Sequence, residues 1–165
     1  MLAIIGYICF MGNVIGISTR IKSRAPMELF TSAKVSFKHG VGDDFRGLKR
    51  NGRQITIMSK EAWEDALTDL GKDLHWTTRR ANILVEGIDL ENTTGEVLKV
   101  GSFLVEITGE LNPCHRMDEQ VAGLTKALTP NWRGGVTCKL LREGIVSEND
   151  RVIFMDKSSL ALETF

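Results

Sequence analysis

Residues 97–119 read VLKVGSFLVEITGELNPCHRMDE and contain the strongest structural signals of the chain. Two apolar runs flank the Gly101-Ser102 pair, a pattern typical of two strands joined by a tight turn. Pro113 ends the second run, and Cys114 follows it in a polar segment. The stretch therefore predicts a β-rich fold with a thiol beyond a strand end, where functional residues often lie.

Short apolar runs on either side of this stretch also indicate strands. Alternation places Val35 with Phe37, and Ile55 with Ile57, on one face of their segments. Further strands are expected over 13–19, over 82–88 and in the C-terminal region. The last of these regions, 135–155, reads as two strands joined by Glu143-Gly144, with a polar turn over 147–150.

Two helices are expected between these strands. Ser59 has the character of an N-cap for a helix that continues to Leu70, where Gly71 ends it. A second helix is predicted from near Asp118 to about Leu128. Because strands and helices do not alternate regularly, we expect a mainly β, partly closed barrel with two or three inserted short helices.

The length and charge of the chain narrow the class of protein. A chain of 165 residues suits one domain and can bury a core without disulfides or metals. With 21 basic and 21 acidic residues, it lacks the basic surplus of proteins that bind nucleic acid or anionic membranes. Three widely spaced cysteines favour a reducing, cytoplasmic location over a disulfide framework.

The N-terminal run over 1–17 is apolar but lacks the Lys or Arg that opens a secretory signal. We interpret it as a first buried strand preceded by an extension, with a membrane anchor as the alternative. Met1 and Met11 are both plausible start residues. The expected organisation is an extension or strand start over 1–12, one domain over 13–156, and a tail over 157–165.

Cys114 is the candidate reactive residue. A free cysteine is often simply a small buried hydrophobe, and we expect that role for Cys9 and Cys138. Cys114 differs because His115 and Arg116 follow it directly, and a helix beginning nearby would favour its thiolate. In an extended segment Arg116 would share a face with Cys114, whereas His115 would point to the opposite face.

Arginines before strands provide a candidate anion site. Arg79 and Arg80 precede one apolar run, and Arg133 precedes the Gly134-Gly135 pair before another. Each group alone is typical of a solvated turn. Together with Arg116 they would offer bidentate donors to phosphate or carboxylate, helped by exposed N–H groups of the two glycines.

Other polar residues give weaker signals. Asp43 and Asp44 lie in a glycine-rich segment, where a solvated turn is favoured over a cation site. His39 and His75 match no zinc pattern.

The order of several segments resembles the MOSC domain, the C-terminal domain of molybdenum cofactor sulfurases, which also occurs in small bacterial proteins. The segments are HGVGDDFRG, RQITIMSKEAWE, RRANILVEGIDL, GEVLKVGSFLVEITGELNPCHRMDE and WRGGVTCKLLREGIVSENDRVIF. The similarity runs from about residue 13 to about residue 155. It implies a mostly β barrel resembling that of pyruvate kinase, with Cys114 as the signature cysteine.

The resemblance also implies positions for the remaining site residues. Arg79, Arg80 and Asn82 correspond to an arginine–asparagine turn, and the loop of Gly40, Gly42 and Asp43 to a glycine–aspartate turn. Arg133, Gly134 and Gly135 correspond to an arginine–glycine–glycine turn. The chain has no counterpart of the aminotransferase-like domain of full sulfurases or of the N-terminal β-barrel domain of amidoxime-reducing relatives. Pyridoxal phosphate chemistry would therefore come from a partner.

Three functions follow as expectations from this resemblance. In the first, Cys114 accepts sulfane sulfur from a pyridoxal-phosphate cysteine desulfurase and delivers it to a molybdenum cofactor, a molybdoenzyme or another metal–sulfur centre. In the second, Cys114 is a molybdenum ligand in an oxidoreductase that reduces N-hydroxylated compounds, and the arginines hold the cofactor phosphate. In the third, the domain is a non-catalytic binding module. No nucleic acid or membrane partner is expected.

Overall fold

The structure, a computed structural model, describes residues 11–160. The predicted apolar extension up to residue 10, with Cys9 and the start at Met1, lies outside the described residues. Residues 161–165 of the predicted tail also lie outside them.

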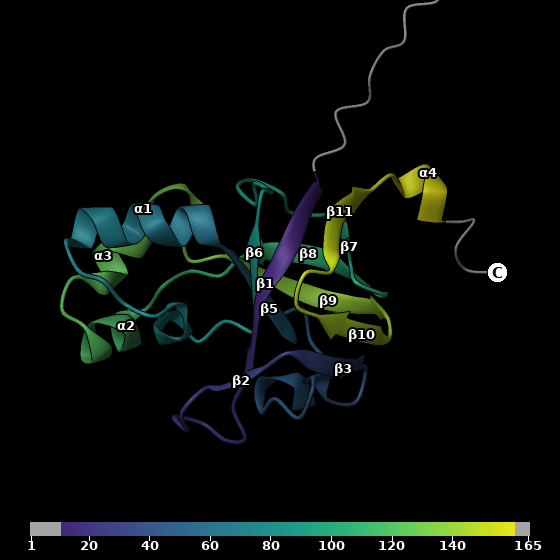
Figure 1. Cartoon of the computed structure of the whole chain (residues 1–165), viewed down its shortest axis with the longest axis horizontal. Helices are drawn as coiled ribbons and strands as arrows, with labels where there is room; N and C mark the ends of the chain where they lie inside the picture. Colours follow the sequence, from purple (N-terminus) through teal and green to yellow (C-terminus); the bar gives the residue numbers. More distant parts are fainter. Residues whose placement is uncertain (1–10, 161–165) are drawn as a thin grey trace, which may run out of the picture.

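Within residues 11–160, seven strands form a closed β-barrel (Figure 1). Around the barrel the order is β1-β6-β5-β9-β8-β7-β11, and β11 pairs back onto β1. The strands in chain order are β1 (Met11–Thr19), β5 (Ile55–Ser59), β6 (Ile83–Glu86), β7 (Val97–Val100), β8 (Phe103–Glu110), β9 (Val136–Arg142) and β11 (Arg151–Met155). All neighbours are antiparallel except β5 and β6, which are parallel. The predicted mainly β barrel is confirmed, and the pairing of β1 with β11 closes it.

Shorter strands extend the barrel. β2 (Glu28–Phe30) pairs with β1 and forms an exposed edge. A second sheet has the order β10-β3-β4, and its strands are β3 (Ser32–Ser36), β4 (Gly40–Val41) and β10 (Gly144–Ser147). The prediction of two strands over 135–155 is wrong, because β10 separates β9 from β11 and pairs with β3 instead of β9.

The helices α1, α2 and α3 lie together on one side of the barrel (Figure 1). The α-helices are α1 (Lys60–Leu70), α2 (His115–Gln120), α3 (Leu124–Leu128) and α4 (Lys157–Leu160), and the 3-10 helices are η1 (Arg46–Leu48), η2 (Trp76–Arg79) and η3 (Pro130–Trp132). The prediction for the first helix is confirmed: the Ser59 side chain accepts a hydrogen bond from the Ala62 N–H, and Gly71 ends the helix in the left-handed region.

The single helix predicted from Asp118 to Leu128 is wrong, because two short helices occupy this region. Gly123 lies between α2 and α3 with φ +88°, which is incompatible with a continuous helix. The Thr125 side chain also turns the chain back, since its hydroxyl donates to the Cys114 carbonyl at 2.8 Å. This hydrogen bond ties α3 to the backbone of Cys114.

Two apolar clusters hold the fold together. One fills the barrel and includes Phe103 and Cys138, both fully buried, so the prediction of a core role for Cys138 is confirmed. The other lies between the helices and the outside of the barrel, with Trp63 and Leu128 among its members. β5 faces both clusters and is buried along its whole length, which explains why its alternation is incomplete.

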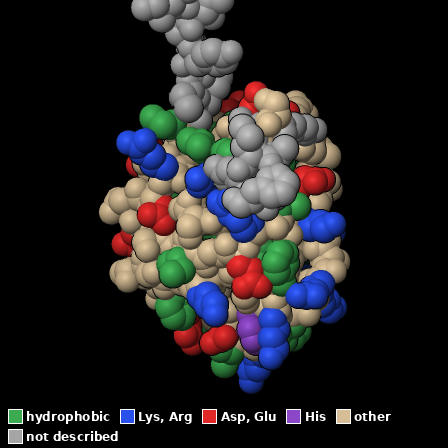
Figure 2. Space-filling view, turned by 90° about the vertical axis from the view of Figure 1, so that its right-hand side faces the viewer, with side chains coloured by type: hydrophobic (Ala, Val, Ile, Leu, Met, Phe, Trp, Pro, Cys, Tyr) green, Lys and Arg blue, Asp and Glu red, His purple; other side chains and the backbone are tan. Residues whose placement is uncertain are grey.

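On the face seen in Figure 2, basic and acidic side chains are interspersed and hydrophobic ones are scattered. Among residues 11–160, no helix combines the length and apolar character needed to cross a bilayer.

Candidate functional site

A cavity of about 570 Å³ lies on the α2 side of the molecule, where segments distant in sequence meet. The loop after β1, the segment around η1, the end of η2 and the start of α2 all contribute to its wall. Its lining residues are Arg20, Ser23, Arg24, Arg46, Arg53, Arg79, Arg80, Leu111, Asn112, Cys114, Arg116, Met117, Glu119 and Gln120. The set contains seven arginines and one acidic residue, so the wall is strongly positive although the whole chain is neutral.

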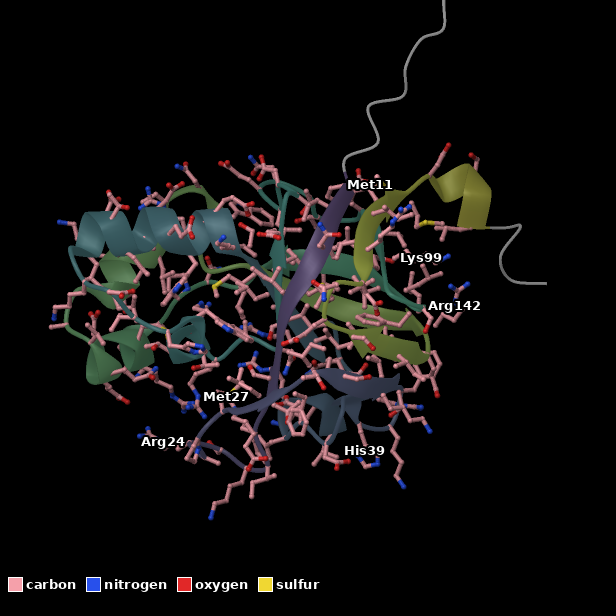
Figure 3. All side chains as sticks on the ribbon, in the orientation of Figure 1. Met11, Arg24, Met27, His39, Lys99 and Arg142 are labelled. Atoms are coloured by element: carbon pink, nitrogen blue, oxygen red, sulfur yellow. The ribbon has the colours of Figure 1, made fainter. Side chains whose placement is uncertain are left out.

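Figure 3 shows that Arg24 lies in the loop between β1 and β2, on the side of α2, whereas Lys99 and Arg142 lie across the barrel.

Cys114 is exposed and lines this cavity. It is the N-cap residue of α2, with an extended backbone, and its side chain forms no capping hydrogen bond. Its carbonyl accepts from the Met117 N–H at 2.9 Å and from the Thr125 hydroxyl at 2.8 Å. The backbone of Cys114 is thus held from two sides while its thiol stays accessible.

The residues after Cys114 are helical, so the extended geometry considered for this segment does not occur. Arg116 nevertheless lines the cavity together with Cys114. His115 is exposed, and its Nε2 lies 3.7 Å from the Glu119 carboxylate. Glu119 also lies 3.7 Å from the Arg24 guanidinium, so it links α2 to the loop after β1.

Arg79 is buried and holds the thiol segment in place. Its guanidinium donates to the Gly134 carbonyl at 3.0 Å and to the Leu111 carbonyl at 2.7 Å. It also contacts the Met117 sulfur at 3.7 Å. Burial, followed by repulsion from Arg46, lowers the pKa of Arg79 to about 10, although its interaction with Cys114 opposes this shift. Arg79 therefore connects η2, the segment after β8, α2 and the segment before β9 through one cation.

Arg80 has a left-handed backbone with φ 66°, and its guanidinium donates to the Ala25 carbonyl. This contact joins the end of η2 to the loop after β1. Burial and repulsion from Arg20 lower its pKa.

Four other arginines of the lining are unpaired. The guanidiniums of Arg20, Arg46, Arg53 and Arg116 form no hydrogen bond or ion pair with any group within residues 11–160. The Nε atom of Arg20 is buried and has no hydrogen-bond partner. Burial, followed by repulsion from Arg20 and Arg53, lowers the pKa of Arg46. Like charges gathered without partners are costly, and a bound anion would relieve that cost.

Asp44 fixes two of these arginines through their backbones. Its carboxylate accepts from the Arg20 N–H at 2.9 Å and from the Arg46 N–H at 3.0 Å. Asp44 is only 2% exposed, so the prediction of a solvated turn is wrong for this residue, whereas its neighbour Asp43 is exposed. Asp44 therefore acts as a buried bracket that positions both arginines.

Several residues predicted for the site lie elsewhere among the described residues. Asn82 is buried directly before β6 and bonds to β5 and β1: its Oδ1 accepts from the Thr56 N–H at 3.1 Å, and its Nδ2 donates to the Ser18 carbonyl at 3.3 Å. Arg133 pairs with Asp69 of α1 and donates to the Ala127 carbonyl at 3.0 Å. Asn82 and Arg133 therefore stabilise the fold and do not line the cavity.

The expectation that Gly134 and Gly135 expose their N–H groups is wrong, because both are buried. The Gly135 N–H donates to the Trp132 carbonyl at 3.0 Å. A Cβ at Gly134 would lie 2.5 Å from the Leu111 carbonyl oxygen and 3.0 Å from the Arg79 guanidinium. Gly134 thus makes room for the Arg79 contacts, Gly135 makes room for the backbone of β5, and the pair does not form an anion cradle.

The sequence interpretation of the site included Arg79, Arg80, Cys114 and Arg116, and the structure brings these four together. It missed Arg20, Arg24, Arg46 and Arg53, which come from the loops around 20–24 and 46–53. The recurrence of basic residues in TRIKSR and in RGLKRNGR was an available signal. Turns rich in Lys and Arg are also common on ordinary surfaces, so this pattern alone is not specific. Within residues 11–160, no group of three or more His, Cys, Asp or Glu side chains is arranged to hold a metal ion.

Comparison with solved structures supports this fold. The YuaD protein from Bacillus subtilis superposes with a TM-score of 0.72 at 19% identity, covering 86% of this chain and 94% of that one. YiiM from Escherichia coli gives a TM-score of 0.67 at 11% identity, with coverages of 88% and 70%. YiiM from Geobacillus stearothermophilus gives 0.65 at 16% identity, with coverages of 89% and 76%. At these identities the likeness concerns the fold alone.

A search of curated proteins finds no match. Residues 38–153 match the family model of the MOSC domain, which covers most of the chain, from β4 into β11 and including Cys114. The chain is therefore a member of the MOSC domain family.

Proposed function

We propose that the cavity binds a phosphate-bearing molybdenum–pterin cofactor and that Cys114 is the protein ligand of its metal. One observation carries this proposal: an accessible thiol lines a cavity that also contains four unpaired guanidiniums. A cysteine that only packs in the fold would need neither an accessible thiol nor unpaired guanidiniums around it.

The anion side of the cavity fits a cofactor phosphate. Guanidiniums bind phosphate through paired, charge-assisted hydrogen bonds, and Arg20, Arg46, Arg53 and Arg116 have this capacity unused. Arg79 and Arg80 would contribute long-range charge, since their hydrogen bonds are already used within the protein.

The thiol side also fits. Thiolate is a soft ligand suited to metal–sulfur chemistry, and the Cys114 side chain is accessible at the cavity wall. When bound, the cofactor would supply redox chemistry, and the class of substrate we propose is N-hydroxylated compounds. In this assignment the arginines orient the cofactor, and Arg79 keeps the Cys114 segment at the cavity wall.

The test is elemental analysis and intact mass of protein purified anaerobically from its native host. We expect molybdenum in stoichiometric amount in the wild type, and its loss in Cys114→Ser. Cys138→Ala is the matched control, because Cys138 is a fully buried thiol of the barrel core. Molybdenum retained by Cys114→Ser, with circular dichroism showing an intact fold, would contradict ligation by Cys114.

A second candidate function is sulfur transfer, and the exposure of Cys114 favours it. The Cys114 thiolate would attack the outer sulfur of a persulfide on a pyridoxal-phosphate cysteine desulfurase. A new S–S bond would form at Cys114 while the donor S–S bond breaks and the donor thiolate leaves. The persulfide would then be delivered to a molybdenum cofactor or a molybdoenzyme.

The same measurement separates the two functions. A mass increase of one sulfur atom on wild type but not on Cys114→Ser, without molybdenum, would favour the carrier. If both molybdenum and the added sulfur are absent, in a host whose cofactor supply is intact, the function that remains is a non-catalytic binding module.

A further inference from the structure

Thr108 occupies an irregular position in β8, the strand that leads toward the thiol segment. The pairing of β8 with β9 shifts register at this point: Ile107 lies opposite Cys138, whereas Gly109 lies opposite Thr137. Thr108 is therefore the extra residue of a β-bulge. Such bulges are frequent at barrel rims and next to functional sites, where they redirect a side chain.

The Thr108 hydroxyl joins the barrel to the loop over residues 49–53. It donates a hydrogen bond to the Gly52 carbonyl. Its oxygen also lies 2.8 Å from the Thr137 hydroxyl and 3.0 Å from the Thr137 carbonyl. A hydroxyl has one proton, so donation to Gly52 leaves the Thr108 oxygen to accept from the Thr137 hydroxyl. A Cβ at Gly52 would lie 3.1 Å from the Thr108 Cγ2, so the loop backbone lies directly against this side chain.

The two ends of this loop are held by other residues. The Arg50 Nε donates to the Phe37 carbonyl at 3.0 Å. Gln54, directly after the loop, is buried, and its amide donates to the same carbonyl at 2.8 Å and to the Gly47 carbonyl at 3.0 Å. The bond from Thr108 adds a third point of attachment, in the middle of the loop. Its removal would therefore displace the middle of the loop while both ends stay in place.

This attachment affects the cavity because Arg53 directly follows Gly52 and lines the cavity with Cys114. The Arg53 guanidinium forms no hydrogen bond or ion pair within residues 11–160, so no polar contact of its own fixes it relative to the thiol. One strand, β8, thus supports both the loop that carries Arg53 and the segment that carries Cys114.

We propose that Thr108 is a positioning residue of the anion site: its hydroxyl holds the loop over residues 49–53 against β8 and thereby directs Arg53 toward an anion bound beside Cys114. Thr108 does not line the cavity, so its effect on binding passes through Arg53. This proposal deepens the proposed function and rests on the part of it that assigns phosphate binding to the cavity.

The test is calorimetric titration of the apoprotein at low ionic strength with inorganic pyrophosphate, a small polyanion suited to guanidiniums. Thr108→Val keeps the shape of the side chain and removes the hydroxyl. We expect it to weaken pyrophosphate binding about three- to fivefold, because the Arg53 side chain is no longer pre-organised. Thr108→Ser keeps the hydroxyl and should bind within about twofold of the wild type.

A double-mutant cycle identifies the route of this effect. Arg53→Gln should weaken pyrophosphate binding about five- to tenfold. Adding Thr108→Val to Arg53→Gln should weaken it by less than about a further 1.5-fold, because the group that Thr108 positions is already absent. If Thr108 only stabilised the barrel, its replacement would lower the affinity by the same factor in both backgrounds.

Two further variants make the test independent of a single substitution. Gly52→Ala places a Cβ against Thr108 from the side of the loop and should weaken pyrophosphate binding even if Thr108→Val folds poorly. Thr93→Val is the matched control, because the Thr93 hydroxyl donates to the Leu90 carbonyl at 2.7 Å in the loop between β6 and β7, outside the cavity. It should leave the affinity unchanged. Circular dichroism establishes that each variant is folded.

Wild-type affinity in folded Thr108→Val, or equal losses in the two backgrounds of the cycle, would overturn the proposal. Failure of the proposed function has a different signature: protein from the native host would lack molybdenum while Thr108→Val still weakened pyrophosphate binding through Arg53. A wild type that does not bind pyrophosphate would overturn the anion site and the role of Thr108 together.

Discussion

At the scale of single residues, the cavity contains two kinds of arginine with different roles. Arg79 is 7% exposed, and its guanidinium donates hydrogen bonds to the Gly134 and Leu111 carbonyls. Arg116 is exposed and unpaired among the described residues. The first kind maintains the shape of the site, and the second is available to a ligand.

Replacing one arginine of each kind separates stability from binding. We expect Arg79→Met to lower the free energy of unfolding by about 2–4 kcal/mol, because two buried carbonyls lose their donors. Arg116→Met should change the free energy of unfolding by less than about 0.5 kcal/mol but weaken pyrophosphate binding. Urea denaturation followed by tryptophan fluorescence and calorimetric titration measure the two effects. Equal stability losses in both variants would contradict this division.

The adjacent residues Asp43 and Asp44 offer a matched pair. Asp44→Asn should lower the free energy of unfolding by about 1–3 kcal/mol, because an amide cannot accept from both the Arg20 and Arg46 N–H groups as a carboxylate does. Asp43→Asn, at an exposed position, should change it by less than about 0.5 kcal/mol. Similar urea midpoints for the two variants would show that the Asp44 bracket adds nothing to stability.

At the scale of elements, the approach of the segment before β9 to the end of β8 decides where Cys114 lies. Gly134 allows this approach, since an added Cβ would meet the Leu111 carbonyl oxygen at 2.5 Å. Leu111 in turn lies close before Cys114 in the chain, so the contact is transmitted to the thiol segment. A single missing side chain thus determines the spacing of two strands.

Gly109 is a matched control for Gly134, because neither has a positive φ and a Cβ at Gly109 would meet nothing within 4 Å. Gly134→Ala should lower the free energy of unfolding by about 1–3 kcal/mol through overpacking. Gly109→Ala should change it by less than about 1 kcal/mol. Thermal and urea unfolding measure both. A larger loss at Gly109 than at Gly134 would mean that contact with Leu111 does not limit the site.

At the scale of the whole molecule, a neutral chain concentrates seven arginines in one cavity wall. Only one acidic residue, Glu119, shares this wall, and Asp44 lies beside Arg20 and Arg46, so the wall is positive and attracts an anion to one side of the molecule. This asymmetry arises because the closed barrel and its helices bring the loops after β1, around η1 and after η2 to the same place.

The asymmetry predicts a strong dependence of anion binding on salt. Raising the ionic strength from about 0.05 to about 0.5 M should weaken pyrophosphate binding by at least about tenfold, because salt screens exposed charges. Arg151→Gln should show the same dependence as wild type, since Arg151 lies outside the cavity. Titrations at the two salt concentrations measure the effect. An affinity that does not change with salt would contradict an electrostatic site.

Several elements were predictable because their signals are local. The helix from Ser59 to Leu70 has its own cap and stop residues, and Cys138 has the apolar neighbours of a core position. The helix break at Gly123 was not predicted, because it accompanies a hydrogen bond from Thr125 back to the Cys114 carbonyl. The burial of Asp44 was not predicted either, because its carboxylate bonds to the N–H of Arg20 in a distant segment as well as to that of Arg46. The resemblance to the MOSC domain identified the correct family, because it depends on several segments that occur in the same order along the chain.

By itself, the sequence determined the mainly β character, the first helix, the core role of Cys138 and the position of Cys114 beyond a strand. These depend on alternation, caps and turn residues, which act between near neighbours. Only the tertiary structure decided which arginines meet at the thiol, because four of them come from loops that are separate in sequence. The tertiary structure also shows that Arg133, Gly134 and Asn82 have structural roles, because their contacts are with other elements of the fold. The physical reason is that charges interact according to their distance in space. Closure of the barrel determines those distances, whereas spacing along the chain does not.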